Sequence, residues 1–248
     1  MENLNRIAYL TDIHGNAKAL KEVLKDIQKE GIQHIVCGGD LIGIGYQSSE
    51  VINHILDWSG SFLSVTGNHD EAILALKKGG PHPKSHAHAR EHHQWLADRL
   101  TEKDVNYLAS LPRQHSFLLG NKKGLVTHYA FKKGMESHPI DLDPFERIQE
   151  PSLKNMKRLF SSKKENIILF GHHHPSHEFN GQKLYLNPGA LGCQHVNKAY
   201  YYIIEEKDNN VCYQRKEIEY DWSSFLNGFE RLKVPERKTL LKIFYGVE

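Results

Sequence analysis

The sequence has little of what marks secreted or membrane-spanning proteins. It contains three cysteines, Cys37, Cys193 and Cys212, an odd number without regular spacing, which favours a reducing compartment over a disulfide framework. Met1 to Arg6 is polar and the apolar run after it is only long enough for a strand, so we expect no export signal. No apolar stretch approaches the roughly 20 residues that a membrane helix needs. We therefore expect a cytoplasmic protein without a membrane partner.

An excess of charge of one sign is also missing. Lys and Arg number 32 and Asp and Glu number 30, which gives a formal net charge of +2. Because proteins that bind nucleic acid usually carry a clustered basic face, we do not expect a nucleic-acid partner. Hydrophobic content of 39% and charged content of 25% are typical of a globular protein. A chain of 248 residues suits a single layered α/β domain.

Histidine, by contrast, is abundant. The 17 histidines raise the expectation of a metal site, because imidazole is the commonest protein ligand for transition metals. Composition does not locate such a site, and a histidine-rich surface would have the same composition.

The first third of the chain alternates between strand and helix patterns. Apolar residues recur at helical spacing in residues 17–29 and again from Val51 to Leu56, and Gly31 ends the first of these helices. This alternation is typical of parallel strands joined by right-handed crossovers. The strands that it predicts are Ile7 to Leu10, Ile32 to Cys37 and Phe62 to Thr66.

The rest of the chain predicts helices followed by more strands. Residues 85–110 indicate two helices, the second starting at a capping-box-like Thr101 and Asp104. Three further strands, a helix from Pro151 to Phe160 and two hairpins follow; the predicted strands are His115 to Leu119, Leu125 to Tyr129 and Asn166 to Phe170, with turns at residues 121–124, 180–181 and 209–210. We expect one domain over residues 1–220 and a helical appendage over 221–248 that packs on it, although a dimerisation element is an alternative for this tail.

Side chains that bind metals recur where the predicted strands end. Loops beyond the carboxyl ends of parallel strands are where open α/β sheets form their sites, so we expect these side chains to converge. Mixed imidazole and oxygen donors suit Mn, Fe or Zn, and the absence of cysteine from these loops argues against a structural zinc site. The segments are Asp12-Ile13-His14, Gly39-Asp40, Gly67-Asn68-His69-Asp70, His128 and Gly171-His172-His173-His174.

A carboxylate such as Asp40 can bridge two cations roughly 3.5–4 Å apart. Two cations at that spacing lower the pKa of a shared water and offset negative charge at phosphorus. This donor set therefore favours hydrolysis of a phosphate ester.

These segments, in this order and spacing, resemble the motifs of the calcineurin-like metallophosphoesterases. The small bacterial and archaeal phosphodiesterase-like branch is the more similar one, because Gly15-Asn16 continues the first motif and Asn187-Pro188-Gly189 follows the last. The resemblance covers about the first four-fifths of the chain and implies a four-layer αββα sandwich of two mixed β-sheets. It also implies two divalent metal ions, with Mn expected to support activity.

The resemblance implies a role for each matching residue. One metal would be held by Asp12, His14, Asp40 and His174, and the other by Asp40, Asn68, His128 and His172. His69 matches the catalytic histidine of the family, which lies beside the metals without binding them and either steadies the transition-state oxygens or protonates the leaving alkoxide.

The sequence departs from the family at three positions. His173 stands where the family usually has Thr, so we expect it to face substrate or to support a ligand. Ile44 stands where phosphoprotein phosphatases and symmetrical dinucleoside tetraphosphatases carry a phosphate-binding arginine, and isoleucine cannot replace that guanidinium. Gly43 replaces the aspartate that orients the catalytic histidine in phosphoprotein phosphatases, which leaves open what orients His69.

Other positions have two interpretations. Asn16 either contacts substrate phosphate or caps the helix that follows it. The histidines of residues 82–93 form a solvated helix face, the reading we favour, or a lid over the metals; they are His82, His86, His88, His92 and His93. Cys37 and Cys193 are interpreted as small buried hydrophobes rather than ligands.

The predicted function is metal-dependent hydrolysis of a small phosphodiester or phosphomonoester, by attack of a water that bridges the metals. A nucleotide phosphatase or a dinucleoside polyphosphate hydrolase is the alternative within the same chemistry. An alternative of another class is a non-catalytic scaffold that uses the fold to bind a partner protein. That hypothesis predicts that His69 is dispensable.

Overall fold

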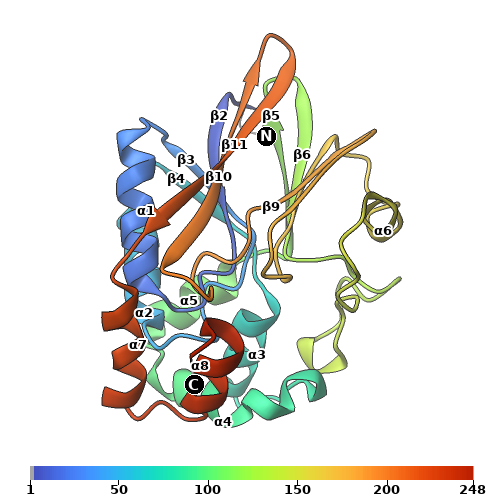
Figure 1. Cartoon of the computed structure of the whole chain (residues 1–248). Helices are drawn as coiled ribbons and strands as arrows, with labels where there is room; N and C mark the ends of the chain where they lie inside the picture. The colour runs from blue at the N-terminus through green and yellow to red at the C-terminus, as the bar shows by residue number, and fades with distance from the viewer. Residues whose placement is uncertain (1–2, 248) are drawn as a thin grey trace.

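Two β-sheets lie face to face between layers of helices in the computed structural model, which describes residues 3–247 (Figure 1). The first sheet has the order β11-β10-β2-β3-β4, in which β2, β3 and β4 are parallel. The second has the order β1-β5-β6-β7-β9-β8 and mixes parallel with antiparallel pairs. The predicted four-layer αββα sandwich is confirmed.

The strands take the following bounds. In the first sheet they are β2 (Arg6–Leu10), β3 (His34–Cys37), β4 (Ser61–Ser64), β10 (Lys198–Lys207) and β11 (Asn210–Glu219). In the second they are β1 (Asn3–Leu4), β5 (Gln114–Leu119), β6 (Lys122–Thr127), β7 (Ile167–Leu169), β8 (His177–Asn180) and β9 (Leu184–Asn187).

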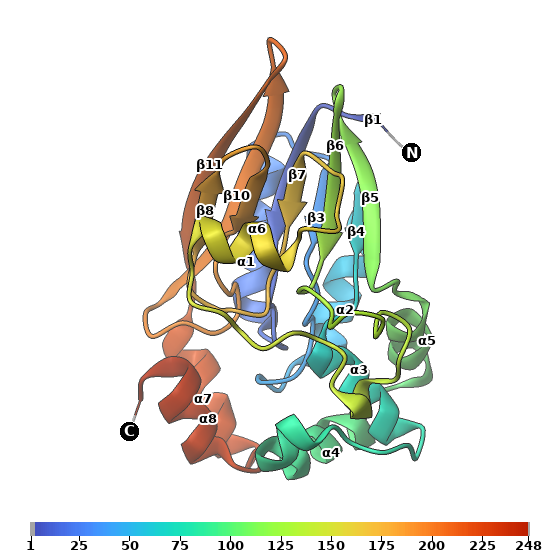
Figure 2. The ribbon, with the colours of Figure 1, turned by 90° about the vertical axis from the view of Figure 1, so that its right-hand side faces the viewer.

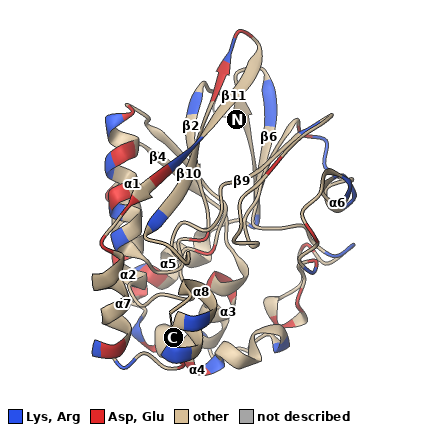
Figure 3. Cartoon of the chain, viewed as in Figure 1, with Lys and Arg blue, Asp and Glu red and all other residues tan. Residues whose placement is uncertain are grey.

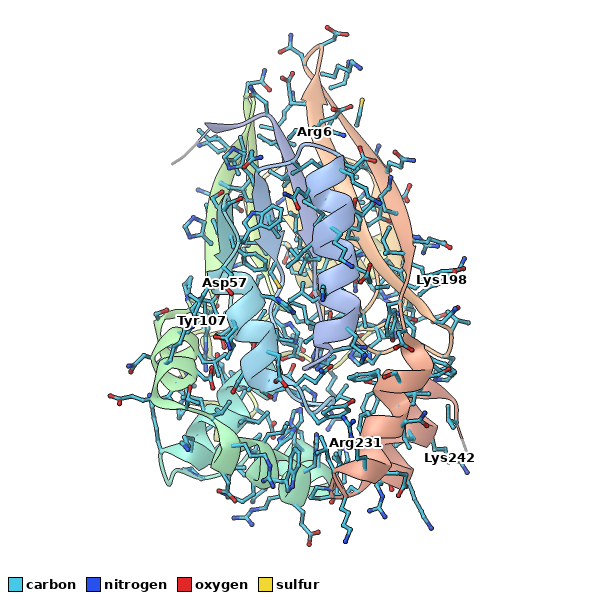
Figure 4. All side chains as sticks on the ribbon, turned by 90° about the vertical axis from the view of Figure 1, so that its left-hand side faces the viewer. Arg6, Asp57, Tyr107, Lys198, Arg231 and Lys242 are labelled. Carbon is cyan, nitrogen blue, oxygen red and sulfur yellow. The ribbon has the colours of Figure 1, made fainter. Side chains whose placement is uncertain are left out.

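Strand β2 shows why the sheets pack in layers. Its side chains alternate between the two faces, as strand geometry requires. Ile7 and Tyr9 enter the apolar core between the sheets, while Ala8 and Leu10 enter the core between the first sheet and its helices. Those helices, α1 (Ala17–Lys29) and α2 (Ser48–Leu56), lie side by side on the outer face of that sheet (Figure 4). On the far side, α6 (Leu153–Leu159) covers the second sheet.

Four helical segments lie together below the sheets: α3 (Asn68–Lys77), the 3₁₀ segment η1 (Lys84–Ala89), α4 (Arg90–Arg99) and α5 (Glu102–Ser110) (Figure 2). The predicted capping box is present at the start of α5, where the Thr101 hydroxyl accepts from the Asp104 amide and the Asp104 carboxylate accepts from the Thr101 amide. A short 3₁₀ turn, η2 (Ile140–Leu142), follows later in the chain. No helix in the described part of the chain combines the length and the apolarity needed to cross a membrane.

The C-terminal segment forms α7 (Trp222–Arg231) and α8 (Arg237–Tyr245). Phe225, Phe229 and Tyr245 are buried in the same apolar cluster as the residues of α1. The Tyr245 hydroxyl also donates to the Gly192 carbonyl, 3.2 Å away. The C-terminal helices therefore share an apolar core with α1.

Two predicted turns are wrong in register. Residues 121–124 were expected to join two strands, but Lys122 and Lys123 already belong to β6, and the turn is Gly120 and Asn121. Gly120 has a φ of +57°, which lets the hairpin close in two residues. The other turn was predicted at residues 209–210, but Asn210 already pairs with Lys207, so the turn is Asp208 and Asn209, which both have positive φ.

Candidate metal centre

Five strand-end loops meet at one edge of the sandwich. The loop after β2 is joined to the loop after β3, because the Asp12 amide donates to the Gly39 carbonyl at 3.0 Å and the His14 amide to the Asp40 carbonyl at 2.9 Å. The loop after β7 is joined to the loop after β6 through the Gly171 amide and the His128 carbonyl, 2.8 Å apart. The His172 amide in turn donates to the Asp12 carboxylate, which joins the two pairs of loops across 160 residues of sequence.

The first group of donors consists of Asp12, His14, Asp40 and His174. The Nε2 atoms of His14 and His174 face each other at 3.0 Å. Oδ1 of Asp12 lies 3.6 Å from His14 Nε2 and 3.8 Å from His174 Nε2, and Oδ2 of Asp40 lies 3.8 Å from His14 Nε2. Donor atoms of the other three residues thus lie within 3.8 Å of His14 Nε2.

The second group consists of Asp40, Asn68, His128 and His172. Oδ1 of Asn68 lies 2.7 Å from His128 Nε2 and 2.8 Å from His172 Nδ1. His128 Nε2 lies 3.2 Å from Asp40 Oδ2, the same oxygen that faces the first group. Oδ1 of Asp40 instead accepts from the His69 amide at 2.9 Å. The structure therefore brings all seven predicted ligands together, with one Asp40 oxygen between the two groups.

Four of the seven residues have a backbone that L-amino acids rarely adopt. The φ angles are +53° at Asp12, +50° at His14, +51° at Asp40 and +69° at His172. Such conformations cost free energy and cluster at functional sites, where the surrounding structure enforces them. The Asp40 carboxylate packs directly against Gly67. A side chain at position 67 would clash with it, because a Cβ on Gly67 would lie 2.1 Å from Asp40 Oδ1.

The charge and hydrogen bonding of the centre fit bound cations. Asp12 and Asp40 are 0% and 1% exposed, and within residues 3–247 no Lys or Arg forms an ion pair with either. Buried carboxylates without a cation are strongly disfavoured. His128 Nδ1 lies 2.9 Å from the Gly38 carbonyl, which only accepts, so Nδ1 carries a proton. When the ring is neutral, Nε2 therefore carries a lone pair that faces two oxygens, Asn68 Oδ1 and Asp40 Oδ2. Three acceptors that face one another in this way can all bind one metal ion.

Burial shapes the protonation of the metal-free centre. Burial raises the pKa of Asp12 to about 7, and the Asp40 carboxylate contributes in the same direction. Burial lowers the pKa of His14 to about 4 and that of His172 to about 3, so both rings are neutral near pH 7. Neutral imidazoles are the form that binds metals.

His69 lies beside the first group of donors. Its ring centroid is 5.0 Å from that of His14, in an edge-to-face arrangement. The ring also packs on Gly43, where φ is +136° and an added Cβ would lie 2.5 Å from the His69 Cβ. Residue 43 therefore has no room for an orienting side chain. His69 Nδ1 is instead 3.0 Å from Nε2 of His93.

The favoured solvated-face interpretation of residues 82–93 is wrong for two of its histidines. His92 and His93 are both 0% exposed. The helical pattern did not show this because α4 packs on α3. The His93 ring reaches His69, whereas the His92 ring stacks on Trp95. His88, by contrast, is exposed.

The two predicted substrate contacts occupy different surroundings. Asn16 is fully buried and caps α1: its oxygen accepts from the Ala19 amide, and its amide group donates to the Gly192 carbonyl and lies 3.1 Å from the Tyr220 hydroxyl. The structure thus shows the N-cap interpretation of Asn16. His173 is half-buried, and its Nδ1 lies 2.7 Å from Nε2 of His177. Its contact with substrate stays a prediction.

Sequence reasoning gave no role to several residues that support the centre. The Asp70 carboxylate accepts from the amides of Leu41, Ile42 and Gly67, which ties the loop after β3 to the start of α3. Cys193 is buried with its sulfur 3.3 Å from His174 Nδ1. The Gly-Asn-His-Asp motif was a signal for Asp70, whereas nothing local in the sequence pointed to Cys193.

A cavity of about 440 Å³ opens beside the second group of donors, where Asn68 and His172 form part of its wall. Phe145 gives it an apolar side, and its ring lies nearly parallel to that of His172. Lys84 and Arg147 line the cavity and form no ion pair within residues 3–247. Elsewhere acidic and basic side chains are interspersed, as Figure 3 shows on α1.

Known proteins are similar to this chain in sequence and in fold. A model of the calcineurin-like phosphoesterase superfamily domain matches residues 6–209. An uncharacterised protein of Methanocaldococcus jannaschii is 29% identical over 248 residues, which cover 93% of this chain and 94% of that one. A hypothetical protein of Pyrococcus horikoshii has a solved structure with a TM-score of 0.75 and 18% identity, covering 98% of this chain and 99% of its own. For a metallophosphoesterase of Sphaerobacter thermophilus the TM-score is 0.70 and the identity 22%, with coverage of 95% and 97%.

Proposed function

Because the chain belongs to the calcineurin-like phosphoesterase superfamily, it is a metal-dependent phosphoric ester hydrolase, and we propose that it cleaves phosphodiesters with two divalent metal ions. The observation that carries this proposal is the pair of donor groups that share Asp40 Oδ2. Asp12, His14 and His174 would hold one ion and Asn68, His128 and His172 the other. Two ions held there supply positive charge to the phosphate oxygens and lower the pKa of attacking water.

The protein's own residues account for the rest of the proposed reaction. Burial lowers the pKa of His69 well below its usual value, so the free ring is neutral, and its Nδ1 is engaged by His93. Nε2 is then left to face the substrate, where the neutral ring can donate a hydrogen bond to the phosphate oxygens or, after taking up a proton, protonate the departing oxygen. The cavity beside Asn68 and His172 offers an apolar surface, Phe145, for one ester group.

The test compares a chromogenic phosphodiester with the corresponding monoester in the presence of Mn²⁺. We expect faster turnover of bis(p-nitrophenyl) phosphate than of p-nitrophenyl phosphate, and loss of both activities after removal of metal with a chelator. Activity that survives complete metal removal, or inertness of the metallated protein toward both esters, would contradict the proposal. A higher kcat/KM for the monoester would reassign the enzyme as a phosphatase.

A second candidate is hydrolysis of a nucleotide or dinucleoside polyphosphate, which Lys84 and Arg147 of the cavity favour because neither forms an ion pair with any residue from 3 to 247. They lie where they can contact a second phosphate, a function that Ile44 cannot perform. Each exposed charge contact is worth at most about 1 kcal/mol, or roughly 5-fold in affinity. If this candidate is right, replacing both with alanine raises KM for a nucleoside diphosphate but not for bis(p-nitrophenyl) phosphate. Replacing Lys29, exposed on α1, serves as the control. Equal effects on both substrates would rule out a second phosphate in this cavity.

Metal binding is expected to release a proton from the second group. Burial alone lowers the pKa of His128, but the facing carboxylates of Asp40 and Asp12 outweigh it and raise this pKa to about 9. Below that pH a metal ion must displace the proton from Nε2, so affinity should fall by up to about tenfold per unit of decreasing pH between 8.5 and 7.5. Calorimetric titration with Mn²⁺ in two buffers of different ionisation enthalpy measures the protons released. Binding without proton release would contradict this prediction.

A further inference from the structure

The Asn68 side chain can serve as a metal ligand in only one of its two orientations. Its amide has an oxygen that binds metals and a nitrogen that does not, and the two ends have almost the same shape. The oxygen must point toward His128 and His172, as it does here at 2.7 and 2.8 Å. Something on the opposite side must therefore accept hydrogen bonds from the nitrogen.

That acceptor is His86, in the η1 segment, whose Nε2 lies 2.7 Å from Asn68 Nδ2. The other ring nitrogen, Nδ1, lies 2.8 Å from the Ser85 hydroxyl, and this hydroxyl donates to the Asp143 carboxylate. A carboxylate only accepts, so the direction of the chain is set from that end. Ser85 donates to Asp143, His86 Nδ1 donates to Ser85, and Nε2 of His86 is left with the lone pair that accepts from Asn68.

A separate chain reaches His69, the next residue along. Nδ1 of His69 is 3.0 Å from His93 Nε2, and Nδ1 of His93 is 2.8 Å from His82 Nε2. His93 is fully buried on α4, so its ring has a fixed place rather than a solvated one. Because Gly43 leaves no room for a carboxylate against His69, this imidazole is the group that holds the ring.

We propose that two histidines of residues 82–93 position the centre: His86 fixes the amide of Asn68 for metal binding, and His93 fixes the ring of His69 for catalysis. This inference rests on the proposed function, since it assigns these histidines to a metal ligand and to a catalytic group. Both act as positioning residues rather than metal ligands, and His86 also lines the cavity beside Asn68.

The two assignments predict different losses, which makes them separable. For His86→Ala we expect Mn²⁺ affinity to fall about 10- to 100-fold at one of two sites, the usual consequence of losing a partner of a metal ligand. Metal content by elemental analysis after gel filtration, together with titration calorimetry, measures this without reference to activity. For His93→Ala we expect both metals to be retained, with kcat about tenfold lower on bis(p-nitrophenyl) phosphate and KM unchanged.

Two kinds of control accompany these variants: glutamine substitutions at the same positions, and removal of a third histidine of the segment. Gln can accept and donate at comparable positions, so His86→Gln and His93→Gln should recover part of the lost function, and they provide a readout if an alanine variant fails to fold. His88→Ala, an exposed histidine of the same segment, should change neither quantity. Unchanged metal affinity in His86→Ala, or loss of metal in His93→Ala, overturns the corresponding assignment. A wild-type protein that binds no metal overturns the proposed function and this inference with it.

Discussion

Asp40→Asn is expected to leave the protein folded but with at most one metal ion and with turnover reduced about 10³-fold or more. The structural reason is that Asp40 Oδ2 is the single atom that faces both donor groups, 3.8 Å from His14 Nε2 and 3.2 Å from His128 Nε2. Asparagine keeps the shape and an oxygen for the His69 amide, but it lacks the negative charge that a bridge between two cations requires. Elemental analysis and steady-state kinetics with bis(p-nitrophenyl) phosphate measure the two losses.

Asparagine is chosen at position 40 because it should not disturb the local backbone, so any loss of metal or turnover reports on the carboxylate. Asp40 has a φ of +51°, a conformation that Asn tolerates better than most residues. Asp208→Asn is a matched control, since it makes the same change at a φ of +52° in the turn between β10 and β11. If Asp40→Asn kept two metals and wild-type turnover, a bridging role for this carboxylate would be wrong.

Much of the architecture was predictable because the relevant signals are local. The 3.6-residue spacing of Leu20, Val23, Leu24 and Ile27 defines the buried face of α1, and the helix was predicted with the bounds that it has. The ends of the strands were predictable because apolar residues give way abruptly to metal-binding residues in the sequence. Since parallel strands place their carboxyl ends at one edge, strand order predicts that the loops of Asp12 and Asp40 meet. Asp12 and His172 follow strands of different sheets, so their contact depends on how the two sheets pack, which the family resemblance implied and strand order alone did not.

What could not be predicted depends on the packing of one helix against another. His92 and His93 occupy a polar stretch of α4 that resembles a solvated face, and only the contact of α4 with α3 shows that they are buried. The link from Ser85 to Asp143 joins residues 58 positions apart, with no motif at either end. The left-handed backbone at His14 and His172 was also hidden, because histidine is not a reliable sign of positive φ.

His69→Ala is the second change with a large expected effect. We expect kcat to fall about 10²- to 10⁴-fold, the range for loss of a general acid or base, while both metals are retained. Retention follows because the contact of His69 with Asp40 is made by the backbone amide, which alanine keeps. The scaffold alternative predicts instead that His69→Ala and wild type are indistinguishable. His115→Ala, at an exposed histidine of β5, is the control for a general effect of removing an imidazole.

The size of that loss on different esters separates the two chemical roles of His69. A p-nitrophenolate leaves readily without a proton, whereas an alkoxide such as a nucleoside hydroxyl needs one. If His69 Nε2 protonates the leaving oxygen, His69→Ala should impair a dinucleoside monophosphate far more than bis(p-nitrophenyl) phosphate. If His69 instead donates to the phosphate oxygens, both esters should lose the same factor, because those oxygens carry similar charge in either reaction. Since the ring lies against His14 with its Nδ1 held by His93, both roles depend on the same free nitrogen, and only the leaving group distinguishes them.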